Sequence, residues 1–144
     1  MRERRDSPML VRKYMTQNVV YANLLDGLHQ TLVRMRERDI RHMPVLGNDG
    51  KLVGIISERD LRRPDFVDPD TNHARPFILD NHTTVEEAMT VTPSTISPDD
   101  QIVSALDLFI TNHYGALPVV EGGEVVGILS TIDMLRAFRD SGAA

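Results

Sequence analysis

The residues most capable of chemistry are a serine and an aspartate three positions apart, a pair that occurs twice in the 144-residue sequence, as Ser57 with Asp60 and as Ser130 with Asp133. Each pair follows an apolar run, so each lies where a strand is predicted to give way to a helix. Backbone N–H groups at a helix start and a serine hydroxyl attract phosphate, while a carboxylate accepts hydrogen bonds from ribose hydroxyls. The spacing therefore indicates a possible nucleotide site.

The same spacing also has a purely structural interpretation. Ser-x-x-Asp resembles a capping box, in which the serine caps a helix and the acidic residue occupies its third position. Gly54 and Gly127 stand three residues before the two serines. A glycine there would allow a ligand to approach the strand backbone closely. From the residues alone, capping and ligand binding both stay open, and one does not exclude the other.

An internal repeat places the two pairs in equivalent positions. The recurring segments are Met15-Thr16 with Met89-Thr90, Pro44-Val45 with Pro118-Val119, and Val53-Gly54-Ile55 with Val126-Gly127-Ile128. The first two recur at an offset of 74 (89 − 15 and 118 − 44) and the third at 73 (126 − 53). Self-similarity of this kind is the signature of repeat architectures. Because a copy of about 50 residues buries little apolar surface alone, we expect the copies to pack as a pseudo-two-fold pair.

Each copy predicts an α+β unit of the order β-α-β-β-α. Asn23 and Ser97 are good N-caps, and Pro98 favours a helix that starts directly after Ser97. The apolar residues that follow have helical spacing: Leu28, Leu32 and Met35, then Ile102, Val103, Leu106, Phe109 and Ile110. Hairpins are predicted over 43–57 and 117–130, first strands near 19–22 and 94–96, and closing helices from Glu58 and Thr131.

The segment between the copies, Pro64 to Thr83, carries three prolines and no sustained period, so it is predicted to be a linker or surface loop. Its potential metal ligands are His73, His82, Asp65, Asp68, Asp70 and Asp80. The histidine spacing fits no standard ligand pattern, so no metal site is expected. The resulting divisions are 1–7 as a disordered N-terminus, 8–63 and 84–140 as the two repeats, 64–83 as the loop and 141–144 as a tail.

Composition excludes several classes of protein. The chain has no cysteine, and hence no disulfide or thiolate metal site, and its net charge of -5 argues against general nucleic-acid binding. No apolar stretch is long enough to span a membrane and no signal peptide is evident, which predicts a cytoplasmic protein with no membrane partner. Arg2, Arg4 and Arg5 are interpreted as a frayed terminus, and His113 as a structural residue at a helix end.

Nothing in the motifs indicates an enzyme. The sequence lacks Gly-x-Ser-x-Gly, a Walker loop and His-Glu-x-x-His, and the glycines near Gly122 fall in a hairpin turn with the wrong spacing for a phosphate loop. No obligatory cofactor is expected.

The repeated Met-Thr, Pro-Val and Gly-h-x-Ser-x-x-Asp motifs (h, apolar) resemble those of a tandem pair of CBS domains, also called a Bateman module, over residues 8 to 140. The resemblance implies a stand-alone regulatory module that binds AMP, ADP, ATP or S-adenosylmethionine in the cleft between its repeats. It also implies a homodimer that passes the ligand state to a separate enzyme or transporter, whose identity the sequence does not give. The long inter-repeat loop is loosely similar to that of modules of the acetoin-utilisation type.

The resemblance also implies roles for particular residues. Asp60 and Asp133 would hold ribose hydroxyls, Ser57 and Ser130 would contact phosphate, and the base would lie against Met43, Leu117, Val20 and Thr95. Only the first copy has the basic residues Arg41, His42 and Arg59; the second has Gly115, Ala116 and Ile132. We therefore expect one dominant nucleotide site. The alternative is a ligand-free dimerisation scaffold in which the Ser-x-x-Asp segments only cap helices.

Overall fold

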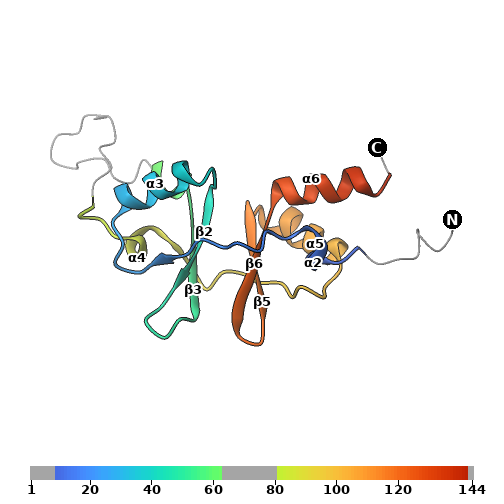
Figure 1. The fold of residues 1–144 in the computed structure, drawn as a ribbon, viewed down its shortest axis with the longest axis horizontal. Coiled ribbons are helices and arrows are strands. Elements are labelled where there is room, and N and C mark those ends of the chain that lie inside the picture. Colours follow the sequence, from blue (N-terminus) through green and yellow to red (C-terminus); the bar gives the residue numbers. More distant parts are fainter. Residues whose placement is uncertain (1–8, 63–80, 143–144) are drawn as a thin grey trace. The chain divides into compact units, whose positions relative to one another are not determined.

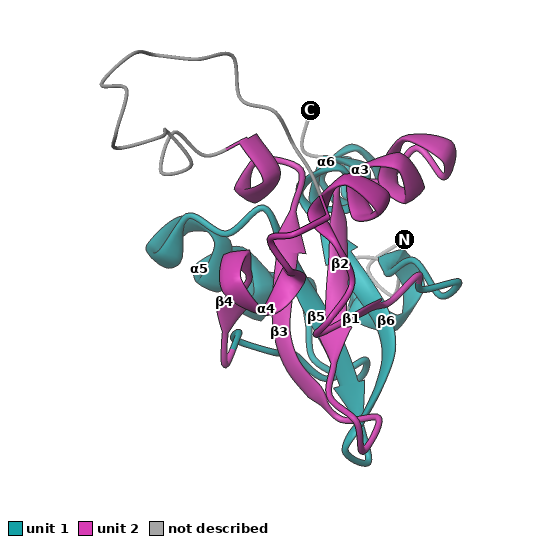
Figure 2. Ribbon diagram, turned by 90° about the vertical axis from the view of Figure 1, so that its left-hand side faces the viewer, with its two compact units in different colours: residues 1–19, 93–144 teal, residues 20–92 magenta. Residues whose placement is uncertain are grey.

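The computed structural model describes residues 9–62 and 81–142, which form two compact units (Figure 2). Unit 1 combines residues up to Val19 with those from Pro93 onward, and unit 2 runs from Val20 to Thr92. The units do not coincide with the sequence repeats. Each unit takes its hairpin from one repeat and a short leading segment from the other.

Unit 2 contains a four-stranded sheet of order β1-β2-β3-β4, of which Figure 1 labels β2 and β3 and Figure 2 labels all four strands. Its strands are β1 (Ala22–Asn23), β2 (His42–Leu46), β3 (Leu52–Ser57) and β4 (Thr90–Val91), and its helices are α3 (Leu28–Glu37), α4 (Val85–Ala88) and the 3-10 helix η1 (Asp60–Arg62). β1 is parallel to β2, whereas β2 with β3 and β3 with β4 are antiparallel. The largest fully buried side chains are Leu28, Met35, Met43, Val45, Ile56, Leu61 and Val85.

Unit 1 repeats this plan with shorter outer strands. It contains the hairpin β5 (Ala116–Glu121) and β6 (Glu124–Ser130), with helices α2 (Val11–Tyr14), α5 (Ile102–Asn112) and α6 (Thr131–Asp140). The outer strands are reduced to single bridges, one parallel between Ile96 and Val119 and one antiparallel between Thr16 and Ile128. Its core includes Val11, Ala105, Leu117, Val119, Leu129 and Ala137. The α+β class and the two hairpins predicted from the sequence are confirmed.

The repeated Met-Thr segments are exchanged between the repeats. Thr90, which belongs to the second repeat, pairs with Ile55 in the first repeat's hairpin, and Thr16 of the first repeat pairs with Ile128 in the second repeat's hairpin. Neither segment pairs within the hairpin of its own repeat. Each closes the outer side of the other repeat's hairpin.

This exchange explains the glycines that precede the Ser-x-x-Asp pairs. A β-carbon on Gly127 would lie 2.7 Å from Met15 Sδ and 3.0 Å from the carbonyl oxygen of Thr16. Gly54 meets Met89 and Thr90 in the same way. The prediction that these glycines give room to a ligand is wrong, because the exchanged segment already occupies that space.

The predicted helix start at Ser97 is also wrong. Ser97 and Asp100 close one isolated turn, in which Asp100 Oδ2 accepts the Ser97 N–H at 2.9 Å. Gln101 is then extended and caps α5, which begins at Ile102. The Asn23 prediction fails in the same way, since Gly27 is the N-cap of α3.

A contact with the exchanged segment accounts for both late starts. In unit 1, Gln101 forms a β-bridge with Leu10, and the Asp100 carbonyl accepts the Val11 N–H at the start of α2, at 2.9 Å. In unit 2, Gly27 forms a β-bridge with Thr84, and the Asp26 carbonyl accepts the Val85 N–H at the start of α4, also at 2.9 Å. A helix running on from Ser97 or Asn23 would use these carbonyls internally.

The remaining predictions about helices, strands and the loop have different outcomes. The closing helix from Thr131 is confirmed as α6, but in the first repeat the described chain reaches only the 3-10 helix η1. The strand predicted near 94–96 is a single bridge at Ile96. Most of the loop and its candidate metal ligands, as well as the N-terminal arginines, lie outside the described residues. Within 9–62 and 81–142, no cluster of three potential ligands and no helix able to span a membrane is found.

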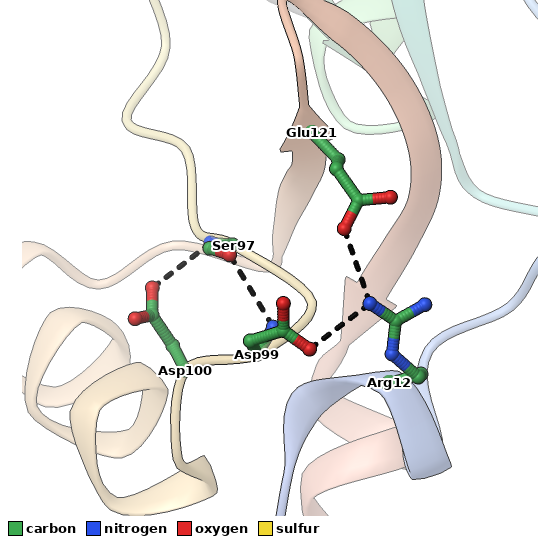
Figure 3. A network of polar contacts seen from close by, with 5 residues as sticks. All are labelled: Arg12, Ser97, Asp99, Asp100 and Glu121. Carbon is green, nitrogen blue, oxygen red and sulfur yellow. Dashed lines mark hydrogen bonds and ion pairs between the residues drawn. The ribbon is translucent and has the colours of Figure 1, made fainter.

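Within unit 1, an exposed ion-pair network joins α2 to the turn before α5 and to the end of β5 (Figure 3). The Arg12 guanidinium donates to Asp99 Oδ1 at 2.9 Å and to Glu121 Oε2 at 3.1 Å. Asp99 lies in the turn before α5 and Glu121 ends β5. The exchanged N-terminal segment is thus held by charge as well as by its bridge at Thr16.

Candidate functional site

In unit 2, the Ser57–Asp60 turn joins β3 to η1 through two reciprocal hydrogen bonds. The Ser57 N–H donates to Asp60 Oδ2 at 2.9 Å, and the Asp60 N–H donates to Ser57 Oγ at 3.1 Å. This is the capping arrangement predicted from the spacing. Within the described parts of the chain, Asp60 Oδ1 and the Ser57 hydroxyl hydrogen have no partner, and both residues are partly exposed. No residue of 9–62 or 81–142 therefore occupies this carboxylate oxygen or this hydroxyl donor.

His42 lies beside this turn, because it is the residue of β2 that pairs with Ser57 across the hairpin. Burial lowers the pKa of the His42 imidazole, the Asp60 carboxylate opposes this by raising it, and Arg41 lowers it further. The ring is therefore held toward its neutral form. An anion placed next to it would favour the protonated form instead.

Two arginines flank the same turn. The Arg41 carbonyl accepts the Glu58 N–H at 2.9 Å, which fixes Arg41 beside the turn, while its side chain is 79% exposed. Its guanidinium contacts Glu58 only at 3.9 Å, whereas Glu58 binds Arg62 at 2.7 Å. Arg59 lies within the turn and is also exposed. The structure thus brings together Arg41, His42, Ser57, Arg59 and Asp60, all predicted as site residues.

The equivalent turn of unit 1 has the same fold but different chemistry. Asp133 is only 2% exposed, and its Oδ2 accepts from the Ser130 N–H at 2.8 Å and the Ser130 hydroxyl at 3.0 Å. Its Oδ1 accepts from Arg136 at 3.2 Å. Both oxygens are engaged, so a ribose would have to displace an existing partner. Ala116 pairs with Ser130 where unit 2 has His42, and no basic side chain stands at Gly115 or Ile132.

Four further predicted residues lie elsewhere in their units. The side chains of Met43 and Leu117 are 0% and 1% exposed and pack in the two cores. Their contact with the base of a ligand stays a prediction. Val20 packs against the unit 2 core, and Thr95 is exposed.

Sequence reasoning missed Arg136 and Glu58. Arg136 follows Asp133 by three residues and Glu58 precedes Arg62 by four, which are spacings that favour ion pairs on a helix. That signal was present in the sequence. The spacing did not reveal that Arg136 donates a hydrogen bond to one of the two oxygens of the Asp133 carboxylate.

Two hairpins, each with helices, an exchanged outer segment and a Ser–Asp turn, define a tandem-repeat module of mixed α and β structure. The sequence profile of the CBS domain matches residues 11–65 and 85–140. The chain belongs to the CBS-domain family, as its motifs predicted.

Similar proteins support this assignment. A CBS domain-containing protein of Dictyostelium discoideum is 33% identical over 131 residues, covering 88% of this chain and 89% of that protein. The structure of CBSX2 in complex with AMP matches with a TM-score of 0.74 at 24% identity, over 92% of this chain and 97% of that one. The CBS domain pair of protein MJ0100, in complex with 5'-methylthioadenosine and S-adenosyl-L-methionine, matches with a TM-score of 0.76 at 23% identity, over 93% and 98%.

Proposed function

We propose that the chain is a regulatory module that binds an adenosine-containing ligand at the Ser57–Asp60 turn and passes its ligand state to a partner protein. The candidate ligands are AMP, ADP, ATP and S-adenosylmethionine. The observation that carries the proposal is the Asp60 carboxylate, whose Oδ1 accepts no hydrogen bond from the described residues and which lies beside the Ser57 hydroxyl and three basic side chains. The two similar solved structures, one in complex with AMP and one with 5'-methylthioadenosine and S-adenosyl-L-methionine, support the proposal.

The chemistry of the turn suits a nucleotide. A ribose diol donates hydrogen bonds that Asp60 Oδ1 can accept. Arg41, Arg59 and His42 are the groups able to meet phosphate charge, and a guanidinium binds phosphate through two parallel hydrogen bonds. The uncharged part of the ligand would contribute to affinity through apolar contacts, while the charged groups would fix the orientation of the ligand.

We assign no catalytic step to this site. A serine nucleophile needs a base in contact with its hydroxyl. Ser57 Oγ instead accepts the Asp60 N–H, and the Asp60 carboxylate accepts from the Ser57 backbone. Both groups hold the turn in place.

We propose one dominant site per chain. The turn in unit 1 lacks the basic residues, and its aspartate is satisfied by Ser130 and Arg136. Ligand binding there would break existing hydrogen bonds, each worth about 1.5 to 3 kcal/mol when a charged group takes part. A ligand that binds Asp60 Oδ1 would displace no hydrogen bond that the described residues make.

The second candidate function is a ligand-free interaction scaffold. It is favoured by the finding that both Ser–Asp pairs are reciprocal caps, which explains the motif without any ligand. A ligand that binds the native state must raise its stability, by about 2.7 kcal/mol at a concentration 100 times its Kd. Melting curves with each of the four adenosine compounds therefore separate the two functions, and no shift with any of them would leave only the scaffold.

A matched pair of substitutions tests the site itself. Asp60→Asn should lower AMP affinity by about tenfold or more in isothermal titration, because one charged acceptor is lost. Asp133→Asn is the control, since it changes the same kind of cap in the other unit. It should leave the affinity for AMP within about twofold of wild type, because the proposed ligand contacts at Asp60 are unchanged. Equal losses from both variants would mean that only capping had been disturbed.

A further inference from the structure

Glu58 lies within the Ser57–Asp60 turn, but its side chain takes no part in the reciprocal cap. The side chain is 25% exposed, and its carboxylate pairs with two guanidinium groups instead. Arg62 Nη2 lies 2.7 Å from Glu58 Oε1, and Arg41 Nε lies 3.9 Å from Glu58 Oε2. Each carboxylate oxygen therefore faces one arginine, and this acid offsets part of the positive charge of both.

The second repeat has no acid at the position of Glu58. Thr131 corresponds to it at the repeat offset of 73 (131 − 58). The two backbone N–H groups donate to equivalent carbonyls, Glu58 to Arg41 at 2.9 Å and Thr131 to Gly115 at 3.2 Å. The Thr131 hydroxyl also donates to the Gly115 carbonyl, at 3.2 Å. The backbone bond holds the turn in both repeats, so the fold does not need the carboxylate of Glu58.

The charged side chains at the turn have little net charge once Glu58 is included. Three guanidinium groups and two carboxylates leave one positive charge (3 − 2): Arg41, Arg59, Arg62, Glu58 and Asp60. Burial lowers the pKa of the His42 imidazole, which therefore adds little to this charge. A phosphate monoester such as AMP carries about two negative charges near pH 7, and each further phosphoryl group adds about one more. Of AMP, ADP and ATP, AMP thus comes closest to the charge that the turn can balance.

The arginines also differ in how far they are already engaged. Among the described residues, the Arg59 guanidinium forms no ion pair, so it can meet a first phosphate without losing a partner. A second phosphate would have to use Arg41 or Arg62, and both already face Glu58. It would either displace the carboxylate or lie beside it, and the like charges would oppose binding.

We propose that Glu58 determines ligand specificity, by restricting the site to adenosine ligands that carry no more than one phosphate. This inference rests on the proposed function and names the class of nucleotide that the site selects, a mononucleotide. Selectivity commonly comes from a group that repels the wrong ligand as well as from groups that attract the right one. Here Arg59 and Ser57 attract the first phosphate, and Glu58 repels those that follow it.

Isothermal titration of AMP, ADP and ATP tests the proposal. The buffer should contain a chelator, because Mg²⁺ neutralises part of the charge of a polyphosphate. Wild type should bind AMP at least about tenfold more tightly than ATP. Glu58→Gln keeps the length of the side chain and the backbone bond to Arg41, but it removes the charge. It should reduce the difference in affinity between AMP and ATP by about tenfold, with ADP between the two.

Two further variants separate the local charge from other effects. Glu58→Thr introduces the residue of the second repeat, which this turn accommodates there, and should reduce the difference as Glu58→Gln does. Glu37→Gln is the control, because Glu37 is an exposed acid on α3 of the same unit and its substitution changes the net charge equally. It should change the ratio of AMP to ATP affinity by less than about twofold, because Arg41 and Arg62 pair with Glu58.

The proposal is overturned if wild type binds ATP as tightly as AMP, if both Glu58 variants keep the wild-type ratio of affinities, or if Glu37→Gln shifts that ratio as strongly. In each of these cases the ligand site itself stands, because adenosine compounds still bind. If neither the three nucleotides nor S-adenosylmethionine bind wild type or any variant, the proposed function fails, and the proposal about Glu58 fails with it.

Discussion

A β-carbon on Gly54 would lie 2.5 Å from Met89 Sδ and 2.9 Å from the carbonyl oxygen of Thr90. β3 and the exchanged segment therefore approach each other more closely than a residue with a β-carbon at position 54 would permit. Gly127 and Met15 stand in the same relationship in unit 1. The glycines of the repeated motif thus serve the exchange of segments between repeats.

Gly54→Ala should lower the free energy of unfolding by about 1 to 3 kcal/mol, the usual cost of overpacking a well-packed site. Urea unfolding followed by circular dichroism measures the change. Since the methionine side chain can move and the Thr90 backbone is held in the sheet, the cost should be only partly relieved when the methionine is shortened.

The double variant Gly54→Ala with Met89→Ala tests that cause. If the clash involves Met89, the glycine substitution should cost less in the Met89→Ala background than in wild type, giving a coupling energy of about 0.5 kcal/mol or more. Simple additivity of the two losses would rule out the contact as the reason for the glycine.

The parts of the fold that depend on neighbouring residues were predictable from the sequence. The hairpins and α6 follow from apolar runs, turn glycines and the Ser130–Asp133 cap, all of which are short-range signals. The exchange of segments was not predictable from one sequence, because the bridge between Thr16 and Ile128 joins opposite ends of the chain. The helix starts failed for the same reason: Ser97 has every feature of a cap, but Leu10 pairs with Gln101 and delays the helix.

The candidate site shows the same division. The cap at Ser57 and Asp60 follows from spacing alone, and the basic residues around it could be read directly from the sequence. The different state of Asp133 depends on burial and on Arg136, which are consequences of packing around α6. Two identical motifs therefore acquired different chemistry through their surroundings.

Removing the two aspartates should affect stability unequally. Asp60→Ala loses one cap on a partly exposed turn, which costs about 1 kcal/mol. Asp133→Ala removes a buried carboxylate that accepts three hydrogen bonds, so we expect a loss of about 2 to 3 kcal/mol. Urea unfolding of both variants provides the comparison, and equal losses would show that burial of Asp133 adds nothing.

Stability should depend on pH through His42. Burial lowers the pKa of this imidazole in the folded protein, so the unfolded chain binds the proton more readily. The contribution of His42 is therefore fully present above the ordinary histidine pKa of about 6.5 and is lost as pH falls through the folded value. His42→Gln should flatten the dependence of the unfolding free energy on pH below about 6.5. An unchanged slope in that variant would assign it to other groups.

Phosphate-bearing ligands and S-adenosylmethionine should respond differently to the basic residues of the site. Arg59→Ile introduces the residue that the second repeat has at the equivalent position, so the variant makes the unit 2 turn resemble its partner. If Arg59 binds phosphate, AMP affinity should fall by about tenfold, the equivalent of one charge-assisted hydrogen bond. S-adenosylmethionine has no phosphate, and its affinity should change by less than about twofold. Titration of both ligands into wild type and variant, with the number of sites per chain fitted, measures this. A fitted value of two equal AMP sites in wild type would contradict the dominance of unit 2, because unit 1 offers neither an exposed arginine at this position nor a free aspartate oxygen.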